Sequence, residues 1–397
     1  MPVILLFIFL DFWLMAVRRN YLMKIKWKLL EIKIPKEILK TPKAMELVFA
    51  SVHSIYARIK FFDKWLKGQM QNWMTFELVG HAGGVHFYIR TPERFRNLLE
   101  SAIYSQYPDI EIIEVEDYVD LLPLVLPNNI YDLWGTNFIL AKDDAYPIRT
   151  YEYFEERVKE KRLDPMAVVT EAMSKVKENE MAWLQLLIKP TDDKWQKEAQ
   201  QVINKLIGRK AGTTNTVWGD LDEFLRNLIK APVSHPTWTE GGSESSPGEL
   251  SSLTPGERDV VAAIENKIAK LGFGSLIRFV YIDKVASFSR GNISAITGAF
   301  RQFNTQNLNA FKPDPGTTTK TKHPFKERKL YFRKRRLYDS YRLRFFPFFL
   351  KVRKLPILNT EELATIYHFP TTFIEAPTLQ RLESRRGEPP AELPLVE

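Results

Sequence analysis

The residues with the clearest potential for chemistry are the basic and aromatic side chains of residues 320–354. This segment, KTKHPFKERKLYFRKRRLYDSYRLRFFPFFLKVRK, has 14 Lys or Arg and two acidic residues, so its net charge is +12, whereas the whole 397-residue chain carries +9. Its nine aromatic residues lie among the charges. Cations attract phosphates and aromatic rings stack on bases, so the segment fits a nucleic acid. The candidate contact residues are Arg333, Lys334, Arg335, Arg336, Arg342 and Arg344.

Two other interpretations of this basic segment stay open. Because each Lys or Arg near an anionic membrane adds about 1 kcal/mol of attraction, the same residues fit anionic lipid. The segment also fits a long helix whose apolar residues pack on the protein while its charges are solvated, with a break or kink at Pro347.

Two smaller groups of residues have side chains that bind metals. His81 and His86 flank a predicted hairpin turn, but two histidines without a third ligand do not complete a zinc site. A cluster of acids suits Mg²⁺ and equally suits a solvated strand edge. We expect surface polar residues at both places, and neither a metal nor a cofactor; the acids are Glu114, Glu116, Asp117 and Asp120.

RNA binding by an open sheet face is a further possibility. His86, Tyr88 and Arg90 lie on one face of the predicted strand GGVHFYIR, and RNA-recognition domains stack bases on aromatic residues of a strand. The aromatic residues have the wrong spacing from the glycines for that motif. We therefore expect this face to pack against a second domain.

The sequence lacks the motifs of the common enzyme classes. No Gly-Lys dipeptide occurs, so the phosphate-binding loop of nucleotide hydrolases is absent. H-E-x-x-H, G-x-S-x-G and G-x-G-x-x-G are absent too, and the chain has no cysteine. We therefore expect no enzymatic activity.

The elements that position these residues indicate an α+β fold. Strand LLEIKIP is followed by a helix starting at Thr41-Pro42, a hairpin of MTFELVG and GGVHFYIRT, a helix starting at Thr91-Pro92, and strand DIEIIEVED. This β-α-β-β-α-β order is that of a ferredoxin-like module, which we expect over residues 29–125.

The rest of the chain divides into three further segments. Residues 131–318 have strand and helix patterns of a second α+β module, for which a degenerate copy of the first is one interpretation. A disordered loop at 234–253, rich in Ser, Gly, Pro and Glu, is expected to interrupt it. The basic, aromatic-rich segment then covers residues 319–355. A capped helix and a Pro-rich tail follow over residues 356–397.

The N-terminus predicts a membrane anchor. Residues 2–17 are apolar except for Asp11, and the basic stretch RRNYLMKIKWK follows. Positive charges after an apolar run favour an uncleaved, single-pass transmembrane helix over residues 1–20, in the inner membrane, with the later domains in the cytoplasm. The alternative is a buried N-terminal helix.

The helix in PILNTEELATIYHFP has clear start and stop signals. Asn359 and Glu362 have the spacing of a capping box, and Pro370 ends the segment. We expect a structural helix, in which His368 lies near the C-terminal end and is not a ligand. Its buried stripe should consist of Leu363, Ile366 and Tyr367.

Several stretches together resemble an uncharacterised bacterial family of membrane-anchored proteins, a domain of unknown function. They are LLEIKIPKEILKTPKAMELVFASVH, VHFYIRTPERFRNLLESAIYSQYPDIEI, DLWGTNFILAKDDAYPIRTYEYFE, DPMAVVTEAMSKVKENEMAWLQLLIKP and LNTEELATIYHFP. Members of that family form the N-terminal region of type IV secretion and conjugation-type DNA-translocating ATPases, or accompany them. In the long members a phrase like LNTEELATIYHFP leads into the motor, whose phosphate loop this sequence lacks.

The resemblance implies a non-enzymatic assembly or docking subunit of a type IV secretion-like translocation system. Its expected partners are the membrane, a separate P-loop ATPase and other secretion-system subunits, with DNA, anionic lipid or a second copy of the chain as further partners. The alternative function, from a different class, is nucleic-acid binding through residues 320–354.

Overall fold

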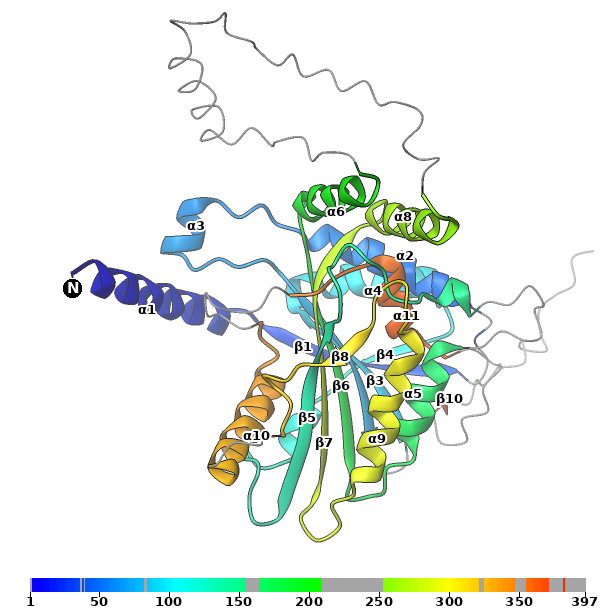
Figure 1. Cartoon of the computed structure of the whole chain (residues 1–397). Coiled ribbons are helices and arrows are strands. Elements are labelled where there is room, and N and C mark those ends of the chain that lie inside the picture. Colours follow the sequence, from blue (N-terminus) through cyan, green and yellow to red (C-terminus); the bar gives the residue numbers. More distant parts are fainter. Residues whose placement is uncertain are drawn as a thin grey trace, which may run out of the picture.

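The computed structural model describes residues 2–35, 38, 40–81, 84–154, 164–208, 253–320, 325–346, 355–370 and 381–382. These residues form an α+β fold, as the sequence predicts. One ten-stranded sheet runs through the molecule, and helices pack on both of its faces (Figure 1). The predicted disordered loop, apart from Leu253, and the Pro-rich tail beyond residue 382 lie outside the described residues.

The sheet is almost entirely antiparallel. Eight strands follow one another in the order β10-β1-β3-β2-β6-β7-β5-β8, while β4 pairs with β1 and β9 pairs with β7. Among the strand pairs of the described residues, only that of β1 with β10 is parallel. The strands are β1 (Trp27–Pro35), β2 (Met74–His81), β3 (Gly84–Pro92), β4 (Glu111–Glu114), β5 (Tyr131–Leu140), β6 (Met181–Pro190), β7 (Gly272–Lys284), β8 (Phe311–Pro313), β9 (Ile357–Asn359) and β10 (Arg381–Leu382).

The two halves of the sheet have the same topology. The first half has the strand order β4-β1-β3-β2, and the second has β8-β5-β7-β6. In each half a helix that packs on the sheet lies between the first strand and the second, and another lies between the third and the fourth. The second half therefore repeats the arrangement of the first. These helices are α2 (Pro42–Val52) and α4 (Arg96–Gln106) in the first half, and α5 (Pro165–Ser174) and α9 (Arg290–Ala299) in the second.

The two halves join edge to edge at β2 and β6. These strands pair antiparallel over their length, from Met74 opposite Ile188 to His81 opposite Met181. In the first half β2 and β3 form a hairpin. In the second half the connection from β6 to β7 contains α6 (Lys194–Leu206) and α8 (Pro255–Ile268), which pack together around a small separate core. The predicted modules at 29–125 and 131–318 thus share one continuous sheet.

Helix starts follow local capping chemistry. The Thr254 hydroxyl and the Glu257 carboxylate form a capping box at the start of α8, and the Asp164 side chain accepts a hydrogen bond from the Met166 amide at the start of α5. Helix α2 begins at Pro42, as predicted, although the side chain of the preceding threonine makes no capping bond.

Helix α11 (Thr360–Ile366) lies on the main helical face, against α2 and α5, where the two halves meet (Figure 1). Its predicted capping box is confirmed: Asn359 Oδ1 accepts from the Glu362 amide at 2.8 Å, and Glu362 Oε2 accepts from the Asn359 amide at 2.9 Å. Leu363, Ile366 and Tyr367 are buried, also as predicted.

The opposite face of the sheet is covered by α10 (Lys326–Leu343) and the short helix η3 (Tyr118–Leu121). A Cβ at Gly135 in β5 would lie 2.5 Å from Leu337 Cδ2, so only glycine there lets α10 pack this closely. The basic segment is thus helical over residues 326–343. The helix ends at Leu343 because Arg344 adopts a left-handed conformation with φ of 51°; Pro347 lies outside the described residues.

Helices α1 (Pro2–Met23) and α3 (Phe61–Leu66) lie together at one side of the molecule (Figure 1). The N-terminal region is therefore helical, but no helix among the described residues is long and apolar enough to cross a membrane. The prediction of a transmembrane helix over residues 1–20 is corrected accordingly. Asp11 interrupts the apolar run, and Arg18 and Arg19 end it.

Candidate functional site

The predicted contact residues of the basic segment lie in different surroundings. Arg335 and Arg336 are exposed on α10, and Arg335 Nε lies 3.8 Å from Asp339 Oδ2. Lys334 is largely buried, with its Nζ 2.7 Å from Asp132 Oδ2. Helix α10 therefore offers some of its charges to solvent and uses others to bind the sheet.

Two more of these arginines bind the protein itself. Arg333 Nη1 donates to the carbonyl oxygens of Thr318 and Lys320, at 3.1 and 2.7 Å. Arg342 Nη2 donates to Asp120 Oδ1 at 2.9 Å. Both guanidinium groups hold α10 against neighbouring segments.

Arg344 lies in the protein interior, where it binds two acids. Its Nε and Nη2 donate to the Glu77 carboxylate at 2.7 and 3.0 Å, and its Nη1 and Nη2 donate to Asp117 at 2.6 and 2.9 Å. Burial alone would lower the pKa of Arg344, but the nearby Glu77 carboxylate and other acceptors raise it above its ordinary value. Arg344 is therefore removed from the set of candidate contact residues, because the protein encloses its side chain.

Glu77, in the middle of β2, is the centre of a buried polar network. Its carboxylate also accepts hydrogen bonds from the Tyr118 hydroxyl at 2.7 Å, from Gln185 Nε2 at 2.9 Å and from the Thr75 hydroxyl at 2.9 Å. Buried charges are stable only when they are paired and hydrogen-bonded. Sequence reasoning missed this residue, although a single acid inside the apolar strand MTFELVG was a usable signal.

Several of the candidate metal ligands make other contacts, whereas the buried Nδ1 of His81 has no hydrogen-bond partner among the described residues. His86 Nδ1 lies 2.9 Å from Glu31 Oε1, and Glu114 pairs with Lys28 and Arg96. Asp117 and Asp120 bind arginines, as described above. In the part of the chain that the structure describes, no three His, Cys, Asp or Glu residues gather in a group that could hold a metal ion.

The strand face considered for RNA binding is covered by protein. Tyr88 stacks on Tyr118 with ring centroids 5.0 Å apart, and the Arg90 guanidinium lies 4.3 Å from the Trp27 ring centroid. This face thus packs against η3 and the start of β1. The expectation that the second module covers it is corrected: the second module extends the same sheet.

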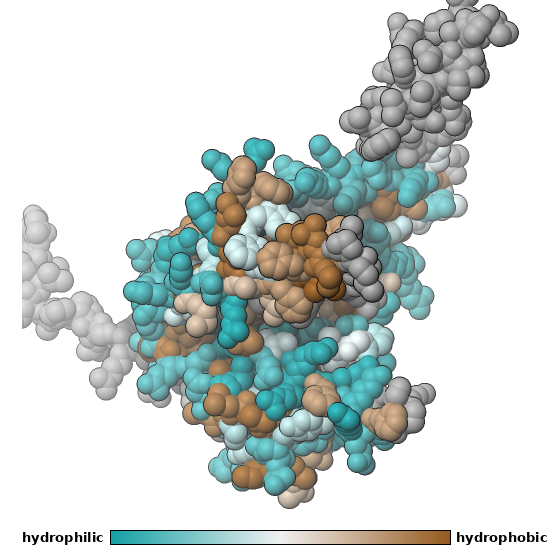
Figure 2. Space-filling model, turned by 90° about the vertical axis from the view of Figure 1, so that its left-hand side faces the viewer, coloured by the Kyte–Doolittle hydropathy of each residue, from teal (hydrophilic) through white to brown (hydrophobic). Residues whose placement is uncertain are grey.

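An apolar surface projects from the body at α1 and α3, and we call it the α1–α3 surface. The Trp13 indole donates to the Trp65 carbonyl oxygen at 3.2 Å, and Gly68, with φ of +65°, lets its segment reach the α1 backbone near Val17. Figure 2 shows apolar residues gathered on the side of the molecule where α1 and α3 lie. The exposed large apolar residues of the two helices are Leu5, Leu6, Phe7, Ile8, Phe9, Phe12, Trp13, Met15, Met23, Phe61, Phe62 and Leu66.

Positive charges border the α1–α3 surface. Asp11 is the only exposed acid on these two helices among the described side chains, while Asp63 is half-buried and pairs with Lys67 at 2.8 Å. An apolar surface with a cationic border matches an anionic lipid surface, which offers acyl chains next to negative headgroups. The exposed cations on and beside the two helices are Arg19, Lys24, Lys26, Arg58, Lys60, Lys64 and Lys67.

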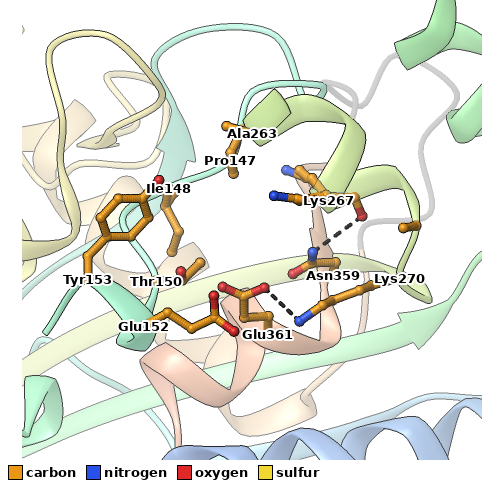
Figure 3. Close-up of a pocket in the computed structure, with 12 residues that line it drawn as sticks. Pro147, Ile148, Thr150, Glu152, Tyr153, Ala263, Lys267, Lys270, Asn359 and Glu361 are labelled. Atoms are coloured by element: carbon orange, nitrogen blue, oxygen red, sulfur yellow. Dashed lines mark hydrogen bonds and ion pairs between the residues drawn. The ribbon is translucent and has the colours of Figure 1, made fainter. Parts of the chain in front are cut away.

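A hollow of about 530 Å³ lies between residues 147–153, α8 and α11 (Figure 3). Lys267 Nζ lies 3.0 Å from Glu362 Oε2 in the interior beside it, and burial raises the pKa of Glu362 although Lys267 opposes this effect. Lys270 Nζ binds Glu361 at 2.7 Å and Glu46 at 2.8 Å. Because each lysine already has an acidic partner, these pairs serve to join α11 to α8 and α2.

Comparison with known proteins identifies a family but no function. The model of a domain of unknown function, DUF8128, matches residues 21–381, which include the sheet that the structure describes except for Leu382 at the end of β10. No curated protein matches the chain. The chain therefore belongs to the DUF8128 family, whose matched region begins in the last turn of α1 and ends at β10.

Proposed function

We propose that the protein is a non-enzymatic, membrane-associated docking subunit, which attaches to a lipid surface through its α1–α3 surface. The observation that carries this proposal is the group of large apolar side chains left exposed on two contacting helices, with cations around them. Soluble proteins seldom expose such a contiguous patch unless a partner or a membrane covers it.

The energetics favour insertion into the interface of a bilayer. Burying one large apolar side chain is worth about 1.5–3 kcal/mol. Each cation near an anionic surface adds about 1 kcal/mol. Phe7, Phe12 and Phe62 are each about two-thirds or more exposed, so a few inserted side chains suffice for stable binding. Trp13 has the amphipathic indole that interfaces favour.

The α+β body then serves as the scaffold of the subunit. We assign the first half to the ferredoxin-like class, supported by its antiparallel order β4-β1-β3-β2 and by α2 and α4 on one face. The repeated order in the second half supports its assignment as a copy of that module. The seam between β2 and β6 makes the two modules one platform.

The machinery served by this platform is proposed from the resemblance of the sequence alone. We place the subunit at the inner membrane, with its body in the cytoplasm, in a type IV secretion-like translocation system that uses a separate P-loop ATPase. Affinity purification of the full chain from detergent-solubilised membranes of its own cells tests this partner. An ATPase should be recovered at a fixed ratio; purification without any nucleotide hydrolase would contradict the assignment.

The membrane attachment is tested by flotation of the full chain with vesicles that contain about one-fifth anionic phospholipid. Phe12→Glu combined with Phe62→Glu should weaken vesicle binding at least about 100-fold, because two inserted aromatic side chains are lost. Leu124→Glu combined with Ile130→Glu is the matched control, since these residues are equally exposed and lie outside α1 and α3. Equal binding by both double variants would refute attachment through this surface.

Nucleic-acid binding through α10 is the second candidate function. It is favoured by the exposed cations and aromatic rings at the start of the helix, including Arg328, Lys329 and Phe332. Affinity for a single-stranded oligonucleotide should then fall steeply with salt and weaken with Arg335→Gln and Arg336→Gln. Binding that does not depend on salt would exclude it.

A further inference from the structure

A groove of about 850 Å³ lies beside α10, and we call it the α10 groove. Its lining includes the cations Arg278, Lys329, Arg333 and Arg336, and none of its described residues is acidic. The apolar side chains of the lining come from α10 and the residues after it, including Phe332, Leu343 and Phe346, while Asn137 and Thr317 add polar groups from other segments. The groove thus combines excess positive charge with an apolar wall.

Arg278, on β7, is the most unusual of these cations. Its side chain is buried, with the residue only 2% exposed. All its hydrogen bonds go to neutral groups: Nε donates to Asn137 Oδ1 at 3.1 Å, and Nη1 donates to Gln185 Oε1 at 2.9 Å and to the Ser340 carbonyl oxygen at 2.6 Å. Burial lowers the pKa of Arg278 to about 10. A buried guanidinium without a bound carboxylate is costly to the fold.

The acids of the neighbouring network, buried Glu77 and half-buried Asp117, are committed to another cation. Glu77 and Asp117 both bind Arg344, in the same layer between the sheet and α10. They therefore leave the charge of Arg278 without an ion pair. The protein keeps this positive charge, which has no ion-pair partner among the described residues, at the edge of an open groove, where a bound anion would pair with it.

The two cations at the rim point to the same kind of ligand. Lys329 and Arg336 are exposed, and within the described ranges neither lies within ion-pair distance of an acid. On α10, Lys329 precedes Phe332 by three residues and Arg333 by four. Arg336 follows Arg333 by three residues and Phe332 by four. Residues with these spacings are neighbours on a helix, so the four side chains share a face. An anion entering the groove would meet cations on α10 and β7 together.

The position of the groove indicates what carries the anion. Phe346, which lines the groove, packs in one small core cluster with Leu22, near the C-terminal end of α1. The groove therefore adjoins the place where the α1–α3 surface joins the body. Helices α1, α3 and α10 lie on the same side of the molecule (Figure 1), the side that faces the viewer in Figure 2. A ligand drawn from a bilayer would reach the groove along this side.

We propose that the α10 groove binds an anionic phospholipid, with its phosphate held by Arg278, Arg336 and Lys329 and an acyl chain along Phe332, Leu343 and Phe346. This inference rests on the proposed attachment to membranes, and it adds a specific lipid site to a general apolar contact. The same cations would bind a free phosphate, but only a lipid also uses the apolar wall.

The test is isothermal titration calorimetry of the full chain with a short-chain anionic phospholipid below its critical micelle concentration. Inorganic phosphate and a single-stranded oligonucleotide are titrated in parallel. Arg336→Gln combined with Lys329→Gln should weaken lipid binding about tenfold or more, because two charge-assisted contacts are lost. Arg335→Gln, the neighbouring exposed arginine that does not line the groove, should change it less than about twofold.

A second variant separates lipid from free phosphate. Leu343→Asp places a charge on an apolar side chain that is 55% exposed at the groove, so it should weaken lipid binding and spare phosphate binding. Three results would overturn the proposal. Phosphate could bind as tightly as the lipid, or the oligonucleotide could bind more tightly than the lipid. The third is an equal loss of lipid binding in the Lys329/Arg336 double variant and in Arg335→Gln.

These measurements use lipid in solution and do not require vesicle attachment. Failure of the groove proposal is thus distinguishable from failure of the membrane proposal, which the flotation of the α1 and α3 variants decides.

Discussion

At the scale of residues, the buried charges divide into paired and unpaired groups. Glu77 and Arg344 are both fully buried and bind each other, whereas Arg278 binds only neutral groups. A buried ion pair contributes little net stability, but removal of one partner leaves the other charge unpaired in the interior. Glu77 and Arg344 therefore act as a structural pair, and Arg278 remains available for a ligand.

Arg344→Met should lower the free energy of unfolding by about 3–5 kcal/mol, because Glu77 would lose its cation. Glu77→Gln combined with Arg344→Met should be less destabilising than the sum of the single variants, since it removes both charges. Urea unfolding followed by tryptophan fluorescence measures both effects. Strictly additive effects in this cycle would show that the pair is not coupled.

At the scale of elements, the two capping boxes have the same chemistry in different environments. Thr254 and Glu257 cap α8 at the surface, whereas Asn359 and Glu362 cap α11 in the interior. Glu362 also accepts from the Ile148 amide at 2.9 Å and pairs with Lys267. The start of α11 therefore connects several segments, and the start of α8 caps only its own helix.

Asn359→Ala should cost about 2 kcal/mol of stability, at the upper end for loss of a cap, because a buried network loses its hydrogen bonds. Thr254→Ala is the matched variant and should cost about 1 kcal/mol or less. Chemical unfolding of the two proteins gives the comparison. A larger loss for Thr254→Ala would mean that the environment of α11 does not determine the energetics of its cap.

At the scale of the whole molecule, the β2–β6 seam makes the two halves interdependent. Separation of the halves would expose two long, apolar strand edges, and such edges pair with other chains. The Trp183 ring in β6 contacts the Tyr118 ring edge to face and stacks on the Tyr341 ring. Residues from both halves and from α10 therefore share one core. Helix α11 covers the junction from the other face.

The full chain should accordingly unfold in one cooperative transition. Tryptophan fluorescence and far-ultraviolet circular dichroism should give coincident urea curves, and a fragment of residues 27–125 should associate or precipitate through its exposed β2 edge. Two separate transitions, or a stable monomeric fragment, would contradict the interdependence of the halves.

Much of the local structure follows from the sequence. The capping box of Asn359 and Glu362, the helix start at Pro42 and the alternating strand around Phe87 depend on residues a few positions apart. The N-terminal helix was predicted correctly as a helix and wrongly as a membrane span, because helical propensity is local whereas spanning requires a longer apolar run.

The sequence by itself determined several helices and strands, including the capping box of α11 and the β2–β3 hairpin, and the excess charge of residues 320–354. The tertiary structure decided which strands pair, which face α10 covers and which cations remain exposed. Arg344 meets Glu77 across 267 residues of chain, and Arg278 meets Asn137 across 141. No local pattern encodes such contacts, since they arise only when the two halves form one sheet and α10 packs on it. The same packing places Arg278 at the groove without an acidic partner.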